Sequence, residues 1–160
     1  RGDIIRNTGI YHLINVMGNY QIDKKKVWKT PTTLVLELFT KYHKGAILKT
    51  NVKTNKFISP RLGKQPSYKN NKMIDASATS YKNEICLSVV NKSENKNIEL
   101  KSPYLNKIYQ TFTINGKNKT DLNSYEKNKK IQIKKNILKY NLNKITLPPH
   151  SINLILFKNC

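Results

Sequence analysis

The stretch ITLPPHSINLILF, residues 145–157, decides how the chain folds near its C-terminal end. Proline has no backbone N–H to donate to a neighbouring strand, so Pro148 and Pro149 predict a corner between two strands. His150 within this corner is either a metal-binding or catalytic group or a structural residue whose hydrogen bonds are satisfied. The residues of this corner alone leave both interpretations open.

The segment after the corner predicts a strand, and similar short segments precede it. Ile152, Leu154 and Leu156 alternate with other side chains, which places them on one face. Residues 53–72, with two prolines, predict a long polar loop. Asn, Lys, Gly and Pro separate the strands, as in a β-sandwich. The predicted strands are 46–52, 74–81, 84–90, 98–101, 107–114, 137–142, 144–147 and 152–157, with a hairpin expected between 84–90 and 98–101.

One helix is predicted from TPTTLVLELFTKYHKG, residues 30–45. Thr30 is a favourable N-cap, Pro31 suits the first helical position, and Gly45 is placed to end the helix. A polar connector is expected before it, at residues 18–29. The helix carries an apolar stripe at helical spacing, made of Leu34, Val35, Leu38, Phe39 and Tyr42.

The composition is strongly basic, with 30 Lys and Arg against nine Asp and Glu and a formal net charge of +21. Only three of the basic residues are arginines, although the arginine side chain is the one that base recognition favours. The lysines are spread through the predicted turns, so we expect no specific nucleic-acid partner and only a low-salt affinity for polyanions. No apolar run approaches the roughly 20 residues of a membrane-spanning helix.

The first residue and the cysteines bear on the extent and the compartment of the protein. Because the sequence starts at Arg1 without a leader-like segment, we expect a processed start or the downstream part of a longer chain. Cys86 and Cys160 are the only cysteines and are predicted to be ordinary thiols rather than a disulfide framework.

Catalytic and metal-binding patterns are scarce. Glu37 stands four residues before Lys41 on the predicted helix, which favours a surface ion pair. Asp121 and Glu126 bracket a predicted capped turn. His12, His43 and His150 show no metal-ligand spacing. The sequence alone therefore predicts no metal, no cofactor and no complete active site.

Five segments in a fixed order resemble the C-terminal region of the α-L-arabinofuranosidases of glycoside hydrolase family 51. The most specific pieces are the Thr-Pro-Thr helix start, a strand ending Ser-Val-Val-Asn, Asn-Ser-Tyr-Glu, and Leu-Pro-Pro-His-Ser. The segments are HLINVMGNYQI, KTPTTLVLELFTKYHKGA, IDASATSYKNEICLSVVNKS, DLNSYEKNKKIQI and ITLPPHSINLILF.

The resemblance implies a mainly β fold, with a C-terminal antiparallel β-sandwich at residues 45–160. Residues 1–44 would be the last segment and helix of a truncated (β/α)8 barrel, whose usual length of about 250 residues places most of it upstream of Arg1. It further implies a retaining enzyme that hydrolyses terminal non-reducing α-L-arabinofuranosides with two catalytic glutamates outside this fragment. The fragment's partner is then the rest of the barrel, and the fragment alone is expected to be inactive.

His12 is the one substrate-binding candidate that the resemblance supplies. Family members commonly have a glutamine before Leu-Val-Asn at the barrel mouth, where it helps to line the arabinose subsite, and this chain has His12 in YHLIN. A sugar contact and a structural role both remain open for His12. For His150 the resemblance favours a structural corner residue, because family members keep this segment in the sandwich, away from the sugar.

The alternative function is a stand-alone binding module for carbohydrates or polyanions. Tyr20, Trp28, Tyr42 and Tyr68 would supply its stacking surface, although aromatic side chains also fill cores. The sequence does not determine compartment or oligomeric state. The resemblance favours a cytoplasmic location and allows a homo-oligomer, because many relatives are intracellular oligomers.

Overall fold

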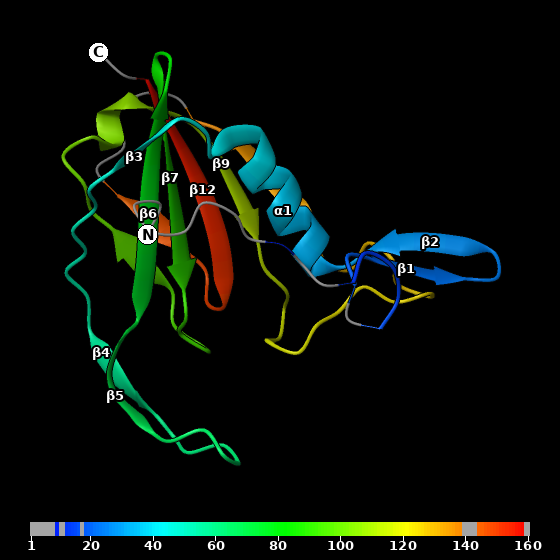
Figure 1. The fold of residues 1–160 in the computed structure, drawn as a ribbon. Coiled ribbons are helices and arrows are strands. Elements are labelled where there is room, and N and C mark those ends of the chain that lie inside the picture. Colours follow the sequence, from blue (N-terminus) through cyan, green and yellow to red (C-terminus); the bar gives the residue numbers. More distant parts are fainter. Residues whose placement is uncertain (1–8, 10–11, 17, 139–143, 159–160) are drawn as a thin grey trace.

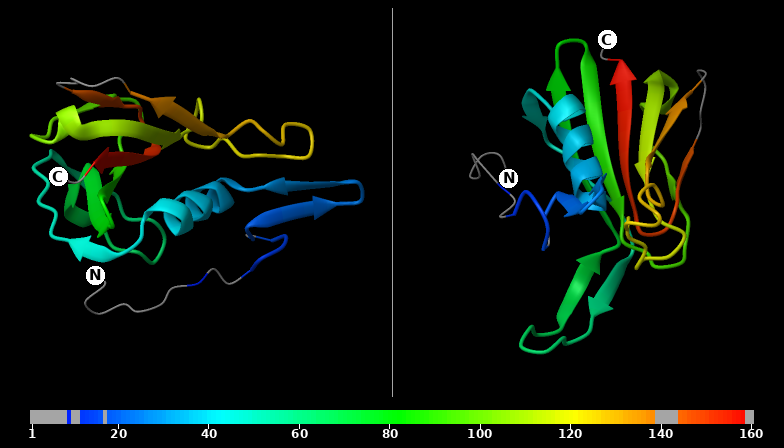
Figure 2. Two further views of the ribbon diagram at one scale, coloured as in Figure 1. Left: turned by 90° about the horizontal axis from the view of Figure 1, so that it is seen from above. Right: turned by 90° about the vertical axis from the view of Figure 1, so that its right-hand side faces the viewer.

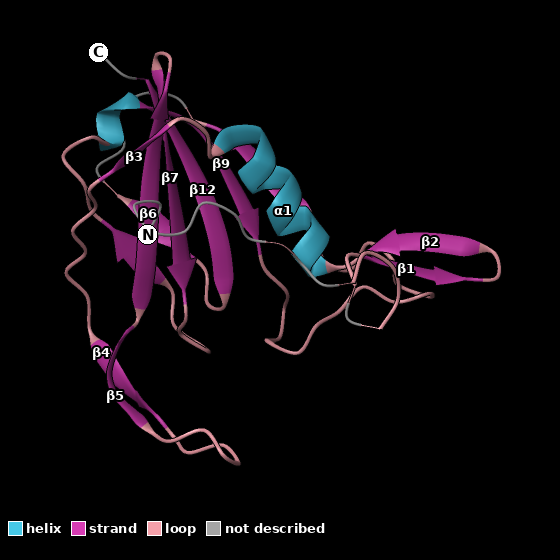
Figure 3. Cartoon of the chain, in the orientation of Figure 1, coloured by secondary structure: helices cyan, strands magenta, loops and turns pink. Residues whose placement is uncertain are grey.

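The computed structural model describes residues 9, 12–16, 18–138 and 144–158. Strands predominate in it, as the sequence predicts, with one α-helix and one short 3-10 helix among the described residues (Figures 1 and 3). The helix lies against one face of the largest sheet, and a smaller β layer covers the other face.

The largest sheet has six antiparallel strands in the spatial order β10-β9-β12-β7-β6-β3. The last strand of the chain therefore lies in the middle of the sheet, paired along its length with β7 and β9. The strand bounds are β3 Ala46–Leu48, β6 Ile74–Tyr81, β7 Glu84–Asn91, β9 Ile108–Ile114, β10 Ile133–Ile137 and β12 Ser151–Lys158.

The central strand β12 is buried on both faces. Leu154 and Leu156 pack toward the helix, and Ile155 and Phe157 pack into a second apolar cluster on the opposite face. The predicted grouping of Ile152 with Leu154 and Leu156 is confirmed. Alternate side chains of β12 thus enter the two hydrophobic clusters on opposite faces of the sheet.

Helix α1, Pro31–Tyr42, forms as the sequence predicts. Pro31 occupies the start, and Gly45 adopts a φ of +83° beyond its end. A Cβ at Gly45 would lie 2.2 Å from the Ser80 carbonyl oxygen, so this close approach to β6 requires glycine. All five residues of the predicted apolar stripe belong to the cluster between α1 and the sheet.

Three smaller two-stranded sheets complete the β structure. The sheet of β8 and β11, with the 3-10 helix, contributes side chains to the core on the far face of the large sheet. The other two sheets are hairpins that extend from the body (Figures 1 and 2). The bounds are β1 Tyr20–Asp23, β2 Lys26–Lys29, β4 Lys56–Ser59, β5 Tyr68–Lys72, β8 Ile98–Leu100, β11 Ile145–Leu147 and η1 Leu105–Lys107.

Several sequence-based predictions of local structure are wrong. The expected connector at residues 18–29 contains the β1–β2 hairpin, and the expected loop at 53–72 contains the β4–β5 hairpin. Strand β8 pairs with β11 rather than with β7. Its partner is non-local, and the short-range turn signal gave no information on it. The expected strand at 137–142 falls partly outside the described residues, and β10 begins earlier, at Ile133.

The Leu-Pro-Pro-His-Ser segment forms the predicted corner between β11 and β12. Buried Asn91, at the end of β7, holds this corner: its Nδ2 donates to the carbonyl oxygens of Leu147 at 3.2 Å and Pro148 at 2.8 Å. The backbone N–H of Ser93 donates to Asn91 Oδ1 at 2.9 Å. Buried backbone carbonyls require such partners, which explains an asparagine at the end of an apolar strand.

Helix α1 and the β-sheet share one hydrophobic core, because α1 residues pack on side chains of β7, β9 and β12. The division at residues 44 and 45 remains a prediction from the sequence.

Candidate functional site

His12, the substrate-binding candidate, is half-buried at the start of a turn that leads into β1. The backbone of this turn is tied to the strand: the N–H of Tyr20 donates to the Leu13 carbonyl at 2.9 Å, and the N–H of Ile22 donates to Asn15 Oδ1 at 2.7 Å. Asn15 has a φ of +53°, which asparagine tolerates better than most residues. The turn therefore has a defined geometry next to His12.

The segment from Leu13 to Val27 exposes an unusual number of large apolar side chains. Leu13 and Val16 are 62% and 75% exposed in the turn, and Val27 is 59% exposed on β2. Ile14 and Ile22 are also exposed. A group of exposed apolar side chains in one segment is typical of a contact surface.

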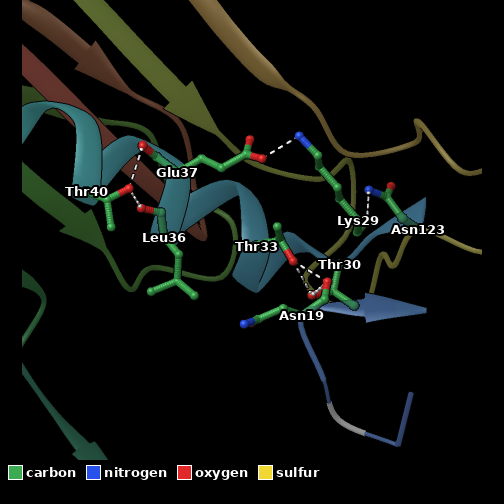
Figure 4. Close-up of polar contacts among 8 residues, drawn as sticks. All are labelled: Asn19, Lys29, Thr30, Thr33, Leu36, Glu37, Thr40 and Asn123. Carbon is green, nitrogen blue, oxygen red and sulfur yellow. Dashed lines mark hydrogen bonds and ion pairs between the residues drawn. The ribbon is translucent and has the colours of Figure 1, made fainter. Parts of the chain in front are cut away.

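The start of α1 is held by the Asn19 carbonyl oxygen rather than by a side-chain cap. This carbonyl accepts hydrogen bonds from the Thr30 N–H and the Thr30 hydroxyl, both at 2.9 Å, and from the Thr33 hydroxyl (Figure 4). Thr30 is the N-cap as predicted, but its side chain makes no cap hydrogen bond within the helix. These hydrogen bonds hold Asn19, which precedes the β1–β2 hairpin, at the first turn of α1.

Asn123 joins the β1–β2 hairpin to the loop before β10. Its Nδ2 donates to the carbonyl oxygens of Lys29 and Ile131, both at 3.0 Å, and its Oδ1 accepts from the Ile131 N–H at 2.7 Å. The Trp28 Nε1–H donates to the Asn123 carbonyl at 3.1 Å, and the Trp28 ring meets Tyr125 edge-on. Sequence reasoning missed Asn123, although it lies in the Asn-Ser-Tyr-Glu motif.

The acidic residues are engaged in structural contacts. Glu37 pairs with Lys29 (Figure 4), so the predicted pair with Lys41 is wrong. Asp121 caps the turn that precedes it, by accepting from the Lys117 and Asn118 N–H groups, rather than the predicted turn across residues 121–126. The Lys130 ammonium group, followed by these backbone donors, lowers the pKa of Asp121 to about 2.

His150 is a structural corner residue, as predicted. Its ring nitrogens Nδ1 and Nε2 lie 3.1 Å from the Glu94 carbonyl oxygen and 3.2 Å from the Gly116 carbonyl oxygen, respectively. Its backbone N–H donates to the Ser93 carbonyl at 2.8 Å. Its φ of +39° fits the tight turn after the double proline.

His43 lies at the end of α1, as predicted, and forms a cluster with two serines of the sheet. Its Nε2 is 3.2 Å from Ser77 Oγ and 3.3 Å from Ser88 Oγ, and the two hydroxyls are 2.8 Å apart. The His43 ring stacks on Phe39 with centroids 5.0 Å apart. A serine–histidine contact is one part of a nucleophilic site, but no carboxylate contact to His43 occurs among the described residues. The cluster is best described as a tether between α1 and the sheet.

We expect this tether to make stability depend on pH. Burial lowers the pKa of His43 below its ordinary value, and the hydrogen bond to the Ser77 carbonyl opposes this shift only in part. The unfolded chain therefore binds more protons than the folded one below the ordinary histidine pKa of about 6.5. The contribution of His43 to the free energy of unfolding is therefore fully present above this pKa and decreases as the pH falls below it.

Urea unfolding at about pH 7.5 and about pH 5.5 measures this effect. The wild-type chain should lose more unfolding free energy between the two conditions than His43→Gln, whose amide keeps a hydrogen-bonding group but does not titrate. Equal losses in the two proteins would show that His43 contributes no pH dependence.

Cys86 lies in β7 as a buried free thiol, as the sequence predicts for an ordinary cysteine. Burial, with a smaller effect of the Glu84 carboxylate, raises the pKa of Cys86 to about 12. A thiol that remains protonated at neutral pH is a poor nucleophile. Cys160 lies outside the described residues.

A cavity of about 940 Å³ opens between the large sheet and the segments 48–54 and 98–104. Its wall is mainly apolar, with Ile74, Leu87 and Leu100 among the lining residues. Glu99, the one carboxylate of its lining, pairs with Lys144. The cavity thus presents an apolar surface without a group of titratable side chains suited to catalysis.

The four aromatic residues considered for a stacking surface lie on four different elements. Tyr42 packs on Phe112 in the core with ring centroids 4.7 Å apart, and Trp28 is engaged with the Asn123 loop. Tyr20 is half-buried on β1, and Tyr68 is exposed on β5. Tyr42 therefore fills the core, and Tyr68 is the most exposed of the four.

No group of three or more histidines, cysteines and carboxylates that could hold a metal occurs in the part of the chain that the structure describes. Within the same residues, no helix has the length and apolar character needed to cross a bilayer.

The fold and these contacts define the protein class. It is a β-sandwich domain that packs one amphipathic helix, and its buried polar side chains hydrogen-bond the backbone of neighbouring segments. The family model described as the alpha-L-arabinofuranosidase C-terminal domain matches residues 1–151, and the chain belongs to this family. No curated protein matches the chain.

Solved structures of α-L-arabinofuranosidases share the fold. The Thermotoga maritima enzyme, solved with arabinose, is 19% identical with a TM-score of 0.76 over 91% of this chain and 32% of its own. The family 51 enzyme from Bifidobacterium longum is 17% identical with a TM-score of 0.82 over 99% of this chain and 31% of its own. The chain thus spans about a third of the length of these proteins.

Proposed function

We propose that this chain is the C-terminal part of a retaining α-L-arabinofuranosidase that hydrolyses terminal non-reducing α-L-arabinofuranosides. Its role is structural: the β-sandwich holds α1 in place, and both catalytic glutamates lie outside these 160 residues. Membership of the α-L-arabinofuranosidase C-terminal family is the observation that carries the proposal.

The exposed segment from Leu13 to Val27 supports a partner in the rest of the enzyme. The segment that carries these exposed apolar side chains leads into the start of α1, at the end of the molecule from which the β1–β2 hairpin extends (Figure 2). A barrel that continues from this segment would cover these side chains, with burial worth about 25 cal/mol per Å² of apolar surface. His12, at the start of the segment, is proposed to hydrogen-bond a sugar hydroxyl at the edge of this contact.

The distribution of the glutamates supports the placement of catalysis elsewhere. Retaining glycosidases use two carboxyl groups about 5–5.5 Å apart, one as acid/base and one as nucleophile. Three of the five glutamates pair with lysines, namely Glu37, Glu94 and Glu99, and Glu84 accepts a hydrogen bond from the Tyr109 hydroxyl. Glu126 lies exposed in the loop before β10.

Single glutamate-to-glutamine variants in an arabinofuranosidase that contains this chain test the proposal. We expect Glu37→Gln, Glu84→Gln, Glu94→Gln, Glu99→Gln and Glu126→Gln each to keep kcat/KM within about threefold of the parent. Loss of a catalytic carboxylate lowers kcat by orders of magnitude. A loss of about a thousandfold in any one variant that unfolds like the parent would contradict the proposal.

The stand-alone binding module is the second candidate, and the exposed Tyr68 with its basic surroundings is the observation that favours it. Sugar binding by such a module should persist at high salt, whereas polyanion binding should fall steeply as salt increases.

A further inference from the structure

We propose that residues 53–72, here called the basic arm, bind an acidic polysaccharide whose sugar units carry carboxylates. The arm consists of the β4–β5 hairpin and its flanking residues, and it projects from the sandwich in Figure 1 and in the right-hand view of Figure 2. The inference rests on the proposed function, because it assigns the arm to the polymer from which arabinofuranosyl groups are removed.

The charge of the arm is of one sign. It contains six cations and no carboxylate, and the sequence from residue 38 to residue 74 holds nine cations without one Asp or Glu. A surface with no interspersed opposite charge has a positive potential that attracts anions. The six cations are Lys53, Lys56, Arg61, Lys64, Lys69 and Lys72.

The cations of the arm lack the partners that lysines have elsewhere in the molecule. Five lysine–carboxylate pairs occur among the described residues, and all of them lie outside the arm. Asp75, the first carboxylate after the arm, pairs with Lys92 at 2.5 Å. Arg61 donates from Nε to the Gly63 carbonyl at 3.2 Å. The charges are thus available to an external anion.

The register of the hairpin places like charges opposite each other. Lys56 and Lys72 are direct cross-strand partners in the β4–β5 ladder. Like charges in such a pair destabilise a hairpin, because the two side chains leave the same face about 5 Å apart. An anionic chain lying across this pair would neutralise both charges, so the arrangement is more favourable in the bound state than in the free state.

Apolar and aromatic side chains accompany the cations. Ile58, Leu62 and Tyr68 are 65%, 69% and 56% exposed on a hairpin with few buried side chains of its own. The flat face of a tyrosine packs against the C–H face of a sugar ring and keeps its hydroxyl in water. Tyr68 is therefore the stacking residue that we assign to the polysaccharide.

The residue types favour an acidic polysaccharide over other anionic partners. Five of the six cations are lysines, which bind anions as compact point charges, whereas base recognition favours the planar fork of arginine. A second copy of this chain would bring another net charge of +21 to the contact, which opposes self-association through the arm.

The test measures binding of the purified chain to polygalacturonate by calorimetry at low and moderate salt. The quadruple variant K56Q/K64Q/K69Q/K72Q should bind at least about tenfold more weakly than wild type and show a smaller salt dependence. Tyr68→Ala should weaken binding by about threefold or more with little change in the salt dependence.

A matched control removes the same charge from exposed lysines elsewhere. The variant K25Q/K127Q/K129Q/K135Q also loses four positive charges, and it should bind within about threefold of wild type. Equal weakening in both quadruple variants would overturn the assignment, because it would show attraction to net charge alone. Both variants are first checked for the same unfolding midpoint as wild type.

Neutral arabinan, single-stranded DNA and phosphatidylglycerol vesicles separate the remaining outcomes. We expect polygalacturonate to bind more tightly than any of the three at moderate salt. Tighter binding of DNA or vesicles through the arm would overturn the polysaccharide assignment. Because binding involves no turnover, a failure of polygalacturonate to bind would overturn the role of the arm and leave the proposed arabinofuranosidase function intact. A catalytic glutamate found within the chain would contradict the proposed function and leave a positive binding result intact.

Discussion

Leu154→Ala is expected to lower the free energy of unfolding by about 3 kcal/mol. Leu154 is fully buried at the centre of β12, between β7 and β9, and packs in the cluster beneath α1. Alanine would leave a cavity that the strands on both sides cannot close, because β12 is held in register with β7 along its length and with β9 from Ile152 to Leu156.

Urea unfolding followed by circular dichroism measures this loss. Leu122, which is 67% exposed, supplies the matched control: Leu122→Ala should change the unfolding free energy by about 0.5 kcal/mol or less. Because α1 shares this core, the helix and strand signals of Leu154→Ala should be lost together in one transition. A loss below about 1 kcal/mol, or a helix that melts separately, would contradict the shared core.

Elements with a strong local pattern could be predicted from the sequence. The α1 stripe has helical spacing and a proline at its start, and β12 alternates between two buried faces. The corner at Pro148 and Pro149 follows from the missing backbone donors. In these segments the local signal and the tertiary packing favour the same structure.

The hairpins could not be predicted from composition. The β4–β5 strands are rich in Lys and Asn and poor in β-branched residues, so intrinsic preference gave no strand signal. The pairing of β8 with β11 joins segments more than forty residues apart in the sequence, and the pairing of Glu37 with Lys29 depends on how the hairpin returns to the helix. These contacts are set by tertiary structure, which short-range spacing does not report.

The structural asparagines form a third group. Asn91 satisfies the backbone carbonyls of Leu147 and Pro148 at the distant corner, and Asn123 satisfies those of distant Lys29 and nearby Ile131. Both lie in motifs that carry the family resemblance, Ser-Val-Val-Asn and Asn-Ser-Tyr-Glu. The resemblance identified the motifs, but only the hydrogen bonds explain why asparagine is needed in each.

The second large effect concerns activity. Under the proposed function, this chain supplies the sandwich and one helix of a larger enzyme. The barrel of such an enzyme typically needs about 250 residues, and its reaction needs two carboxyl groups about 5–5.5 Å apart. Without the nucleophile and the acid/base, no covalent glycosyl intermediate forms, and the full enzymatic acceleration of at least about a millionfold is lost. The folded chain alone is therefore expected to be inactive.

The decisive measurement is the initial rate of 4-nitrophenyl α-L-arabinofuranoside hydrolysis by the purified chain. The chain must first show cooperative unfolding, so that inactivity is not caused by misfolding. The account predicts a rate equal to the buffer blank at enzyme concentrations where a whole arabinofuranosidase gives rapid turnover. Turnover that co-purifies with the folded chain, and that disappears in one of its glutamate-to-glutamine variants, would contradict it.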